Sequence, residues 1–182
     1  MRFLIFVLIL TVACTSAGDT QTVGETGNVY EPELYVGGIT IPWGMDWLPN
    51  GDMLVTERSG SLFIVRDGQI VGEPVAGLPD DIYARGQGGL LDVRVHPDYE
   101  SNGWIYFTYS SSSGEGDGAN TALIRARLED NSLKDLQTLY KATPNTTRGQ
   151  HYGSRIEFDP EGYVYFSIGD RGNRDVNPQD LG

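Results

Sequence analysis

The chain of 182 residues carries 25 acidic and 13 basic residues, which gives a net charge of -12 at pH 7. Such a balance argues against nucleic acid or an anionic membrane as partner and favours neutral or cationic ones. With 39% hydrophobic residues, 24 glycines and 10 tyrosines, the composition indicates one turn-rich β domain rather than a helical or disordered chain. Cys14 is the only cysteine, which rules out an intrachain disulfide and a zinc cluster of cysteines.

The N-terminus has the pattern of an export signal. Arg2 precedes an apolar run at residues 3–13, which is too short to span a bilayer as a mature helix but has the length of a secretory signal. The residues before Cys14 resemble a bacterial lipoprotein cleavage box, in which the cysteine becomes the lipid-bearing N-terminus. Residues 15–17 offer an ordinary cleavage site instead, and both alternatives remain open.

These features divide the chain into three parts. We expect residues 1–17 to form the export signal and residues 18–33, which are polar and acidic, to form a flexible linker. Residues 34–182 are expected to form the folded domain. The signal predicts a periplasmic or outer-surface location, either free or anchored by lipid on Cys14.

A strand–turn–strand pattern occurs three times in the folded part. The turns lie at residues 49–51, 97–103 and 159–162, each between runs of alternating apolar residues. Further strand candidates follow the first two copies, at residues 61–66 and 122–128. A unit of about four strands that recurs at intervals of roughly 40 to 60 residues is typical of the blades of a β-propeller.

The number of copies is smaller than a closed propeller needs, because propellers close with roughly four to eight blades. We therefore expect an all-β fold in which this chain supplies about three blades, as the N-terminal part of a longer protein. The Ser/Gly-rich tract 110–120 is expected to be a loop within the second blade. No long helical period is present, and residues 130–139 are expected to form at most a short turn of helix.

The third hairpin brings two polar residues to the same end of a sheet. His151 comes just before its first strand, and Asp170 follows its second strand between glycines. A carboxylate beside an imidazole fixes the tautomer and raises the basicity of the ring, as a general base near neutral pH requires. A histidine bonded to backbone and an aspartate that caps a turn are the alternative that the pairing alone leaves open.

Several motifs, in this order, resemble the glucose/sorbosone dehydrogenase family, the soluble aldose sugar dehydrogenases that depend on pyrroloquinoline quinone (PQQ). The motifs lie at residues 43–51, 56–62, 85–93, 96–99, 151–156 and 167–172. The resemblance extends from about Leu34 to the end of the chain. It implies a six-bladed β-propeller, of which this chain supplies about the first three blades.

The resemblance also implies an activity. Members of the family oxidise the C1 hydroxyl of an aldose to the lactone, and the hydride passes to PQQ while a histidine takes the proton. His151 matches that histidine, Asp170 matches the acid that hydrogen-bonds it, and Gln87 matches a glutamine that contacts substrate and cofactor. The glycines around Gln87 would let backbone approach a planar ligand closely. The electrons would pass on to a small acceptor such as a quinone or a cytochrome.

In the family, Ca²⁺ polarises PQQ, and most of its ligands, like the cations that bind the carboxylates of PQQ, belong to later blades. The resemblance therefore implies that they lie mainly beyond residue 182. We predict that the chain of 182 residues alone has no dehydrogenase activity.

Other polar and aromatic residues are expected to be structural. His96 precedes a proline that opens a turn, as in the other repeats. The tryptophans are expected to pack between blades. Arg155 and Arg171 lie beside the predicted site in the sequence and are left without a role.

Two rival functions remain open on the same scaffold. A metal-dependent propeller lactonase would need converging carboxylates, for which Asp46, Glu57 and Asp92 are the candidates. A non-catalytic propeller that binds glycans or proteins is the other, because the scaffold also serves as an interaction module.

Overall fold

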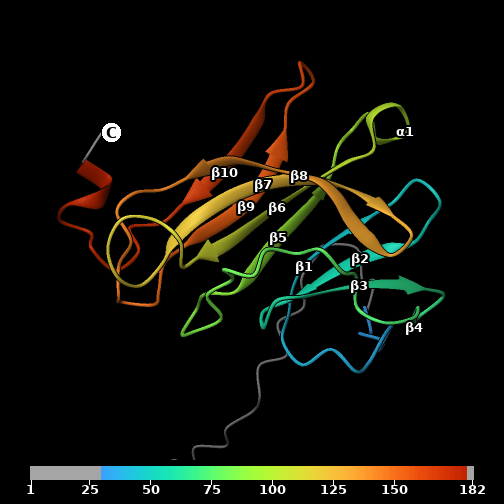
Figure 1. Ribbon diagram of the computed structural model, residues 1–182. Coiled ribbons are helices and arrows are strands. Elements are labelled where there is room, and N and C mark those ends of the chain that lie inside the picture. The colour runs from blue at the N-terminus through green and yellow to red at the C-terminus, as the bar shows by residue number, and fades with distance from the viewer. Residues whose placement is uncertain (1–29, 180–182) are drawn as a thin grey trace, which may run out of the picture. The chain divides into compact units, whose positions relative to one another are not determined.

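The structure is a computed structural model that describes residues 30–179 (Figure 1). The predicted export signal, Cys14 and most of the predicted linker lie outside the described residues. The chain divides into two units at Glu33, and Leu34–Gly182 forms a compact unit by itself. None of the helices in residues 30–179 is long and apolar enough to cross a membrane.

The first sheet, which we call blade 1, has four antiparallel strands in chain order: β1 (Pro42–Trp47), β2 (Met53–Glu57), β3 (Ser61–Arg66) and β4 (Gln69–Ile70). The turn between β3 and β4 is Asp67-Gly68, and both residues have positive φ, at 49° and 74°. This is the backbone that a two-residue hairpin turn requires. Every residue of β2 is buried, because apolar groups cover both faces of the sheet there.

The second sheet, blade 2, repeats this arrangement with longer strands: β5 (Leu90–Val95), β6 (Trp104–Ser111), β7 (Asn120–Glu129) and β8 (Ser132–Lys141). A single helical turn, α1 (Tyr99–Asn102), lies in the connection between β5 and β6 and ends at Gly103, whose φ is 68°. The left-handed conformation at that position is the usual glycine stop of a helix.

The expectation of a short helical turn at residues 130–139 was wrong, because this segment enters strand β8. Asp130 and Asn131 both have positive φ, at 47° and 56°, and reverse the chain in a tight hairpin. Within β8 the register with β7 shifts, and Asp135 has a φ of 51°. Such a bulge interrupts the alternation of side chains. The leucines of this strand, Leu133, Leu136 and Leu139, are three residues apart in the sequence, a spacing that resembles a helical period.

The third sheet is a hairpin of β9 (Gly153–Phe158) and β10 (Val164–Ile168), followed by the short 3₁₀ helix η1 (Asn177–Gln179). It packs on blade 2 through β5 and β6, whereas blade 1 packs on β5 (Figure 1). Two apolar clusters fill these interfaces. The larger joins blades 1 and 2 around Leu54, Phe107 and Ile124, and the smaller joins blade 2 to the hairpin around Leu123 and Ile156.

The three tryptophans differ in their surroundings. Trp104 packs against the cluster between blade 2 and the hairpin, and the guanidinium groups of Arg125 and Arg127 lie 4.3 Å and 4.0 Å from its ring centre. Trp43 and Trp47 are 43% and 55% exposed on β1, so the expected packing between blades is not observed for them in residues 30–179.

Candidate active site

The structure places the side chains of His151 and Asp170 in contact. His151 lies in the connection from β8 to β9, and Asp170 follows β10, so the hairpin between them returns the chain to the same end of the sheet. His151 Nδ1 is 2.9 Å from Asp170 Oδ1. An ionised carboxylate only accepts hydrogen bonds, so Nδ1–H is the donor. This tautomer leaves Nε2 as the nitrogen that can take a proton.

Asp170 is held in its charged form by the backbone around it. Its Oδ1 also accepts a hydrogen bond from the backbone N–H of Gly172 at 2.7 Å. That bond, followed by the contact with His151, lowers the pKa of the carboxyl. The His151 side chain remains 52% exposed and that of Asp170 21%, so the pair faces a space that a ligand can enter.

The backbone of His151 is fixed from two sides in the left-handed conformation, with a φ of 57°. Its N–H donates to Gln87 Oε1 at 2.8 Å, and its carbonyl oxygen accepts the N–H of Arg171 at 3.0 Å. A Cβ on Gly169 would lie only 1.9 Å from that carbonyl oxygen, so a glycine is required there. A left-handed non-glycine residue at a candidate active site is held by its surroundings rather than by local preference.

Gln87 therefore contacts the loop that carries His151. Besides its side-chain bond, its backbone N–H donates to Gly149 O at 2.8 Å. The neighbouring Gly86 has a φ of 60°, and a Cβ on it would lie 2.2 Å from the same Gly149 oxygen. In this structure the glycine at position 86 thus gives close approach to the His151 loop, whereas the sequence led us to expect close approach to a planar ligand.

Sequence reasoning missed Arg58, which supports Gln87 from blade 1. Its Nη1 donates to Gly86 O at 2.8 Å and to Gly88 O at 3.4 Å. The signal was present in the motif at residues 56–62, but nothing in the motif indicates which loop the arginine reaches. The arginine and the glutamine together attach the connection between blades 1 and 2 to the site.

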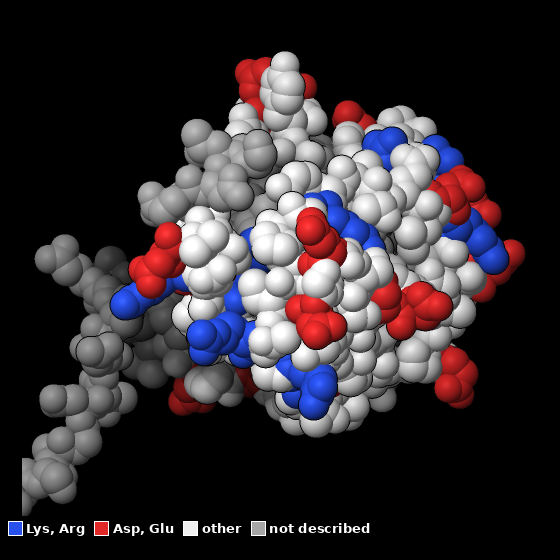
Figure 2. Space-filling model, turned by 60° about the vertical axis from the view of Figure 1, so that its left-hand side comes forward, with Lys and Arg blue, Asp and Glu red and all other residues white. Residues whose placement is uncertain are grey.

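A cavity of about 360 Å³ opens beside the His151–Asp170 pair. Its lining residues are Arg148, Gln150, His151, Asp170, Gly172, Asn173, Arg174 and Asp175. A larger cavity of about 610 Å³ lies at the α1 connection and contains none of the predicted site residues. The smaller cavity is the better candidate because it alone of the two is lined by the His151–Asp170 pair. On the face shown in Figure 2, basic groups are interspersed among the acidic ones.

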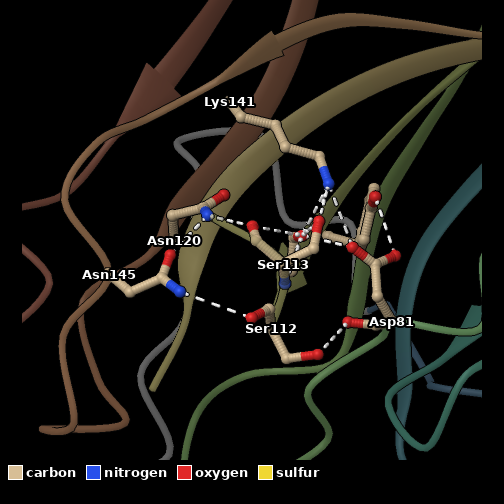
Figure 3. A network of polar contacts seen from close by, with 8 residues as sticks. Asp81, Ser112, Ser113, Asn120, Lys141 and Asn145 are labelled. Atoms are coloured by element: carbon tan, nitrogen blue, oxygen red, sulfur yellow. Dashed lines mark hydrogen bonds and ion pairs between the residues drawn. The ribbon is translucent and has the colours of Figure 1, made fainter. Parts of the chain in front are cut away.

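A network of polar contacts joins the end of β8 to Asp81 and to the serines at the end of β6 (Figure 3). Lys141 Nζ, at the end of β8, lies 3.0 Å from both Asp81 Oδ2 and Ser111 Oγ and also donates to Ser113 Oγ. Burial alone would raise the pKa of Asp81, but hydrogen bonds from the two serines and the charge of Lys141 outweigh burial and lower that pKa to about 2. The network therefore contains a stable ion pair.

An asparagine pair continues this network toward the site. Asn120 Nδ2 donates to Asn145 Oδ1 at 2.6 Å and to Ser113 O at 2.8 Å. Two backbone hydrogen bonds, of 2.9 Å and 3.0 Å, join Ala119 and Thr146. The segment that leads from β8 to His151 is thus attached to the Ser/Gly-rich loop of blade 2.

The three carboxylates considered for a cation site lie apart and serve the backbone. Asp46 accepts the N–H of Val95 at 2.7 Å, and Asp92 accepts the N–H of Ile156 at 2.8 Å, so each joins two blades. Glu57 accepts the N–H groups of Ile41 and Ser59. Within residues 30–179 no cluster of three or more histidine, cysteine or acidic side chains has the arrangement of a metal site.

Comparison with known proteins identifies relatives of most of the described region. A family model for glucose/sorbosone dehydrogenase matches residues 39–182. The chain is 38% identical over 143 residues to the aldose sugar dehydrogenase YliI of Escherichia coli (strain K12), a match that covers 77% of this chain and 38% of that protein. The chain spans less than half the length of the curated relatives it matches.

Solved structures give the same result. The apo form of the soluble aldose sugar dehydrogenase from Escherichia coli matches with a TM-score of 0.75 at 36% identity, over 82% of this chain and 43% of that chain. The PQQ-bound form of an aldose sugar dehydrogenase from Streptomyces coelicolor matches with a TM-score of 0.69 at 25% identity, over 82% of this chain and 44% of that chain. These matches confirm the predicted all-β propeller fold. Within residues 30–179 it is represented by two four-stranded blades and two strands of a third.

Proposed function

Because the chain belongs to the glucose/sorbosone dehydrogenase family, we propose that it acts in a PQQ-dependent sugar dehydrogenase that oxidises the C1 hydroxyl of an aldose to a lactone. The contact between His151 Nδ1 and Asp170, at 2.9 Å, is the observation that carries this proposal. It orients an imidazole that is half exposed beside a cavity, with Nε2 free to accept a proton.

The residues of the pair have different tasks in this proposal. His151 Nε2 accepts the proton of the C1 hydroxyl, as the imidazole of a general base does. Asp170 keeps the ring in the required tautomer and stabilises the imidazolium that forms, without taking the proton itself. PQQ, when bound, supplies the acceptor for the hydride that leaves C1. Gln87 holds the backbone of His151, and its amide NH₂ group remains as a donor for substrate or cofactor.

Two basic side chains of the cavity can contact an anionic cofactor, although Asp170 and Asp175 also line it. PQQ carries three carboxylates, and Arg148 and Arg174 line the cavity together with His151. A guanidinium matches a carboxylate with two parallel hydrogen bonds. We propose that these arginines contribute to PQQ binding, together with the groups expected beyond residue 182. Binding of Ca²⁺ belongs to the same proposal, with its ligands expected mainly beyond residue 182.

The cellular setting is proposed on the sequence of the N-terminus. The export signal at residues 1–17 supports a periplasmic or outer-surface enzyme, with Cys14 as the point of lipid attachment if the cleavage box is used. An exported sugar dehydrogenase would take an aldose as substrate and pass electrons to a quinone or a cytochrome.

The test uses the full-length protein as its gene encodes it, reconstituted with PQQ and Ca²⁺. We expect aldose-dependent reduction of a dye with formation of the lactone, and a loss of roughly 10²-fold or more in kcat for His151→Ala, as removal of a general base predicts. Omission of PQQ should abolish the reaction, and the chain of 182 residues alone should show none. Absence of dye reduction by a full-length protein that has bound PQQ and Ca²⁺ would contradict the proposal.

A further inference from the structure

Arg171 is a buried cation directly after the candidate acid. It is 4% exposed and forms no ion pair with any carboxylate in residues 30–179. Its Nη1 donates to Gly169 O at 3.1 Å and its Nη2 to Thr143 O at 3.3 Å, while its buried Nε has no hydrogen-bond partner in the described part of the chain. Burial lowers the pKa of the guanidinium. Burying a charge without a counter-ion costs several kcal/mol, so the placement calls for a physical reason.

The contacts of Arg171 converge on the loop that carries His151. The guanidinium reaches the carbonyl of Thr143, at the start of that loop. The carbonyl of Arg171 accepts the hydroxyl of Thr146 at 2.6 Å, and its N–H donates to the carbonyl of His151 at 3.0 Å. Arg171 alone therefore contacts this loop at three points, namely Thr143, Thr146 and His151.

The backbone conformations of the two residues depend on this attachment. Arg171 has a φ of 51° and His151 a φ of 57°, and both lie in the left-handed region that non-glycine residues avoid. Strain of this kind persists where the surrounding structure over-determines the conformation. The hydrogen bond between the two backbones, together with the bond from His151 N–H to Gln87, supplies that restraint.

We propose that Arg171 is the positioning residue of the His151–Asp170 pair: its buried guanidinium holds Thr143 and its backbone holds Thr146 and His151, so that residues 143–151 stay attached to the turn after β10 and His151 Nδ1 keeps facing Asp170. In this role the guanidinium does not touch the substrate. The effect on turnover rests on the proposed function. The fixation of the loop does not, and it can be measured separately.

The clamp predicts a specific kinetic result. Arg171→Met removes the two bonds to carbonyl oxygens, and Arg171→Lys cannot restore them, because an ammonium group lacks the planar fork that reaches two acceptors. We expect both variants to lower kcat by about 10²-fold, since a displacement of about 1 Å in a reacting group has such an effect. The KM for the sugar should change less than about 3-fold, because the walls of the cavity remain.

Arg127 offers a matched control in blade 2. Its Nε donates to Asn102 O at 3.0 Å, its Nη1 pairs with Asp135 at 2.7 Å, and its guanidinium stacks on Trp104. It thus has a comparable set of contacts near the α1 connection, where none of the site residues lies. Arg127→Met should lower the melting temperature and leave kcat unchanged.

The experiment combines backbone hydrogen exchange with turnover in the full-length protein. We expect Arg171→Met to accelerate exchange in residues 143–152 by about 10-fold or more, whereas Arg127→Met leaves that segment unchanged. If the variant fails to fold, Thr146→Val serves in its place, because it removes only the hydroxyl that binds Arg171 O and should accelerate exchange in the same segment.

The outcomes separate the two proposals. Faster exchange in residues 143–152 supports the clamp even if wild type shows no PQQ-dependent turnover, which would overturn only the proposed function. Unchanged exchange in this segment, in Arg171→Met or in the substitute Thr146→Val, overturns the clamp. An active wild type together with an Arg171→Lys variant whose kcat is within 2-fold of it also overturns the clamp.

Discussion

The two histidines of the described region show how differently one residue type is used at the two ends of the same sheets. His96 follows β5, and its ring centre lies 5.1 Å from that of Phe158, at the end of β9. His151 lies before the start of β9. His96 Nδ1 accepts hydrogen bonds from the N–H of Asp98 and from Asn102 Nδ2, both at 3.0 Å. The structure thus supports the expected structural role of His96.

The difference between them lies in what faces Nδ1. At His96 two donors face the nitrogen, so Nδ1 must be unprotonated, and the ring secures a turn. At His151 a carboxylate faces the nitrogen, so Nδ1 carries the hydrogen and the basic nitrogen is the one directed away from the carboxylate. The tautomer of a histidine at a turn is thus set by whether the groups that face Nδ1 are donors or acceptors.

The largest expected effect separates the two histidines directly. His151→Gln should lower kcat by roughly 10²-fold or more and change the free energy of unfolding by less than about 0.5 kcal/mol, because the side chain is half exposed. His96→Gln should do the opposite, with a loss of about 1 kcal/mol of stability and an unchanged kcat. Sugar oxidation assays give kcat, and urea unfolding gives the free energy of unfolding, for each of the two variants. Equal losses of activity in both would remove the distinction.

A second comparison concerns two lysines of strand β8. Lys141 ends this strand, from which the chain continues to His151, and it forms an ion pair with Asp81. Lys141→Met leaves the partly buried carboxylate of Asp81 without its cation. We expect a loss of about 1 to 3 kcal/mol in the free energy of unfolding, measured by urea denaturation. Lys134→Met, on the exposed face of the same strand β8, is the matched control and should change stability by less than about 0.5 kcal/mol.

Acid should remove the stability that Asp81 contributes. The pKa of Asp81 is lowered to about 2 in the folded protein, so its contribution to stability is complete above the unfolded value near 4. That contribution, about 1 to 2 kcal/mol, is lost as the pH falls from about 4 to 2. The slope of stability against pH in this window should be smaller in Asp81→Asn. An identical slope would show that Asp81 is not the group involved.

A smaller effect is expected at the acid of the pair. Asp170→Asn keeps an acceptor for His151 Nδ1–H but loses the charge that stabilises the imidazolium. A charged partner strengthens such a bond by about 1 kcal/mol, which corresponds to a loss of about 5- to 10-fold in kcat. Sugar oxidation assays of the variant and of wild type supply the check, and an unchanged kcat would contradict this role of the charge.

The contact between His151 and Asp170 could be predicted because its geometry is local. His151 and Asp170 are 19 residues apart, and the hairpin between them is marked by alternating apolar residues and by the turn at residues 159–162. A hairpin of known length fixes which residues meet at its open end. The strand β8 was missed for the reverse reason, since its bulge at Asp135 removes the alternation on which strand prediction depends.

The contacts that hold the pair could not be predicted. Gln87 meets His151 across 64 residues, and Lys141 meets Asp81 across 60. No period or turn signal relates residues so far apart, because their meeting depends on how one blade packs on the next. The burial of Arg171 was also hidden, since arginine is mostly exposed in proteins.

The attachment of His151 to Gln87 makes the site dependent on contacts of high sequence separation. Its histidine comes from the connection between blade 2 and the hairpin, and its glutamine comes from the connection between blades 1 and 2. Loop-closure entropy opposes such contacts, so they are the ones that a disturbed packing of blades releases most readily. In the proposed function, a pair held in this way depends on the assembly of its scaffold: a chain whose blades are misaligned loses the geometry of the histidine while its individual sheets still persist.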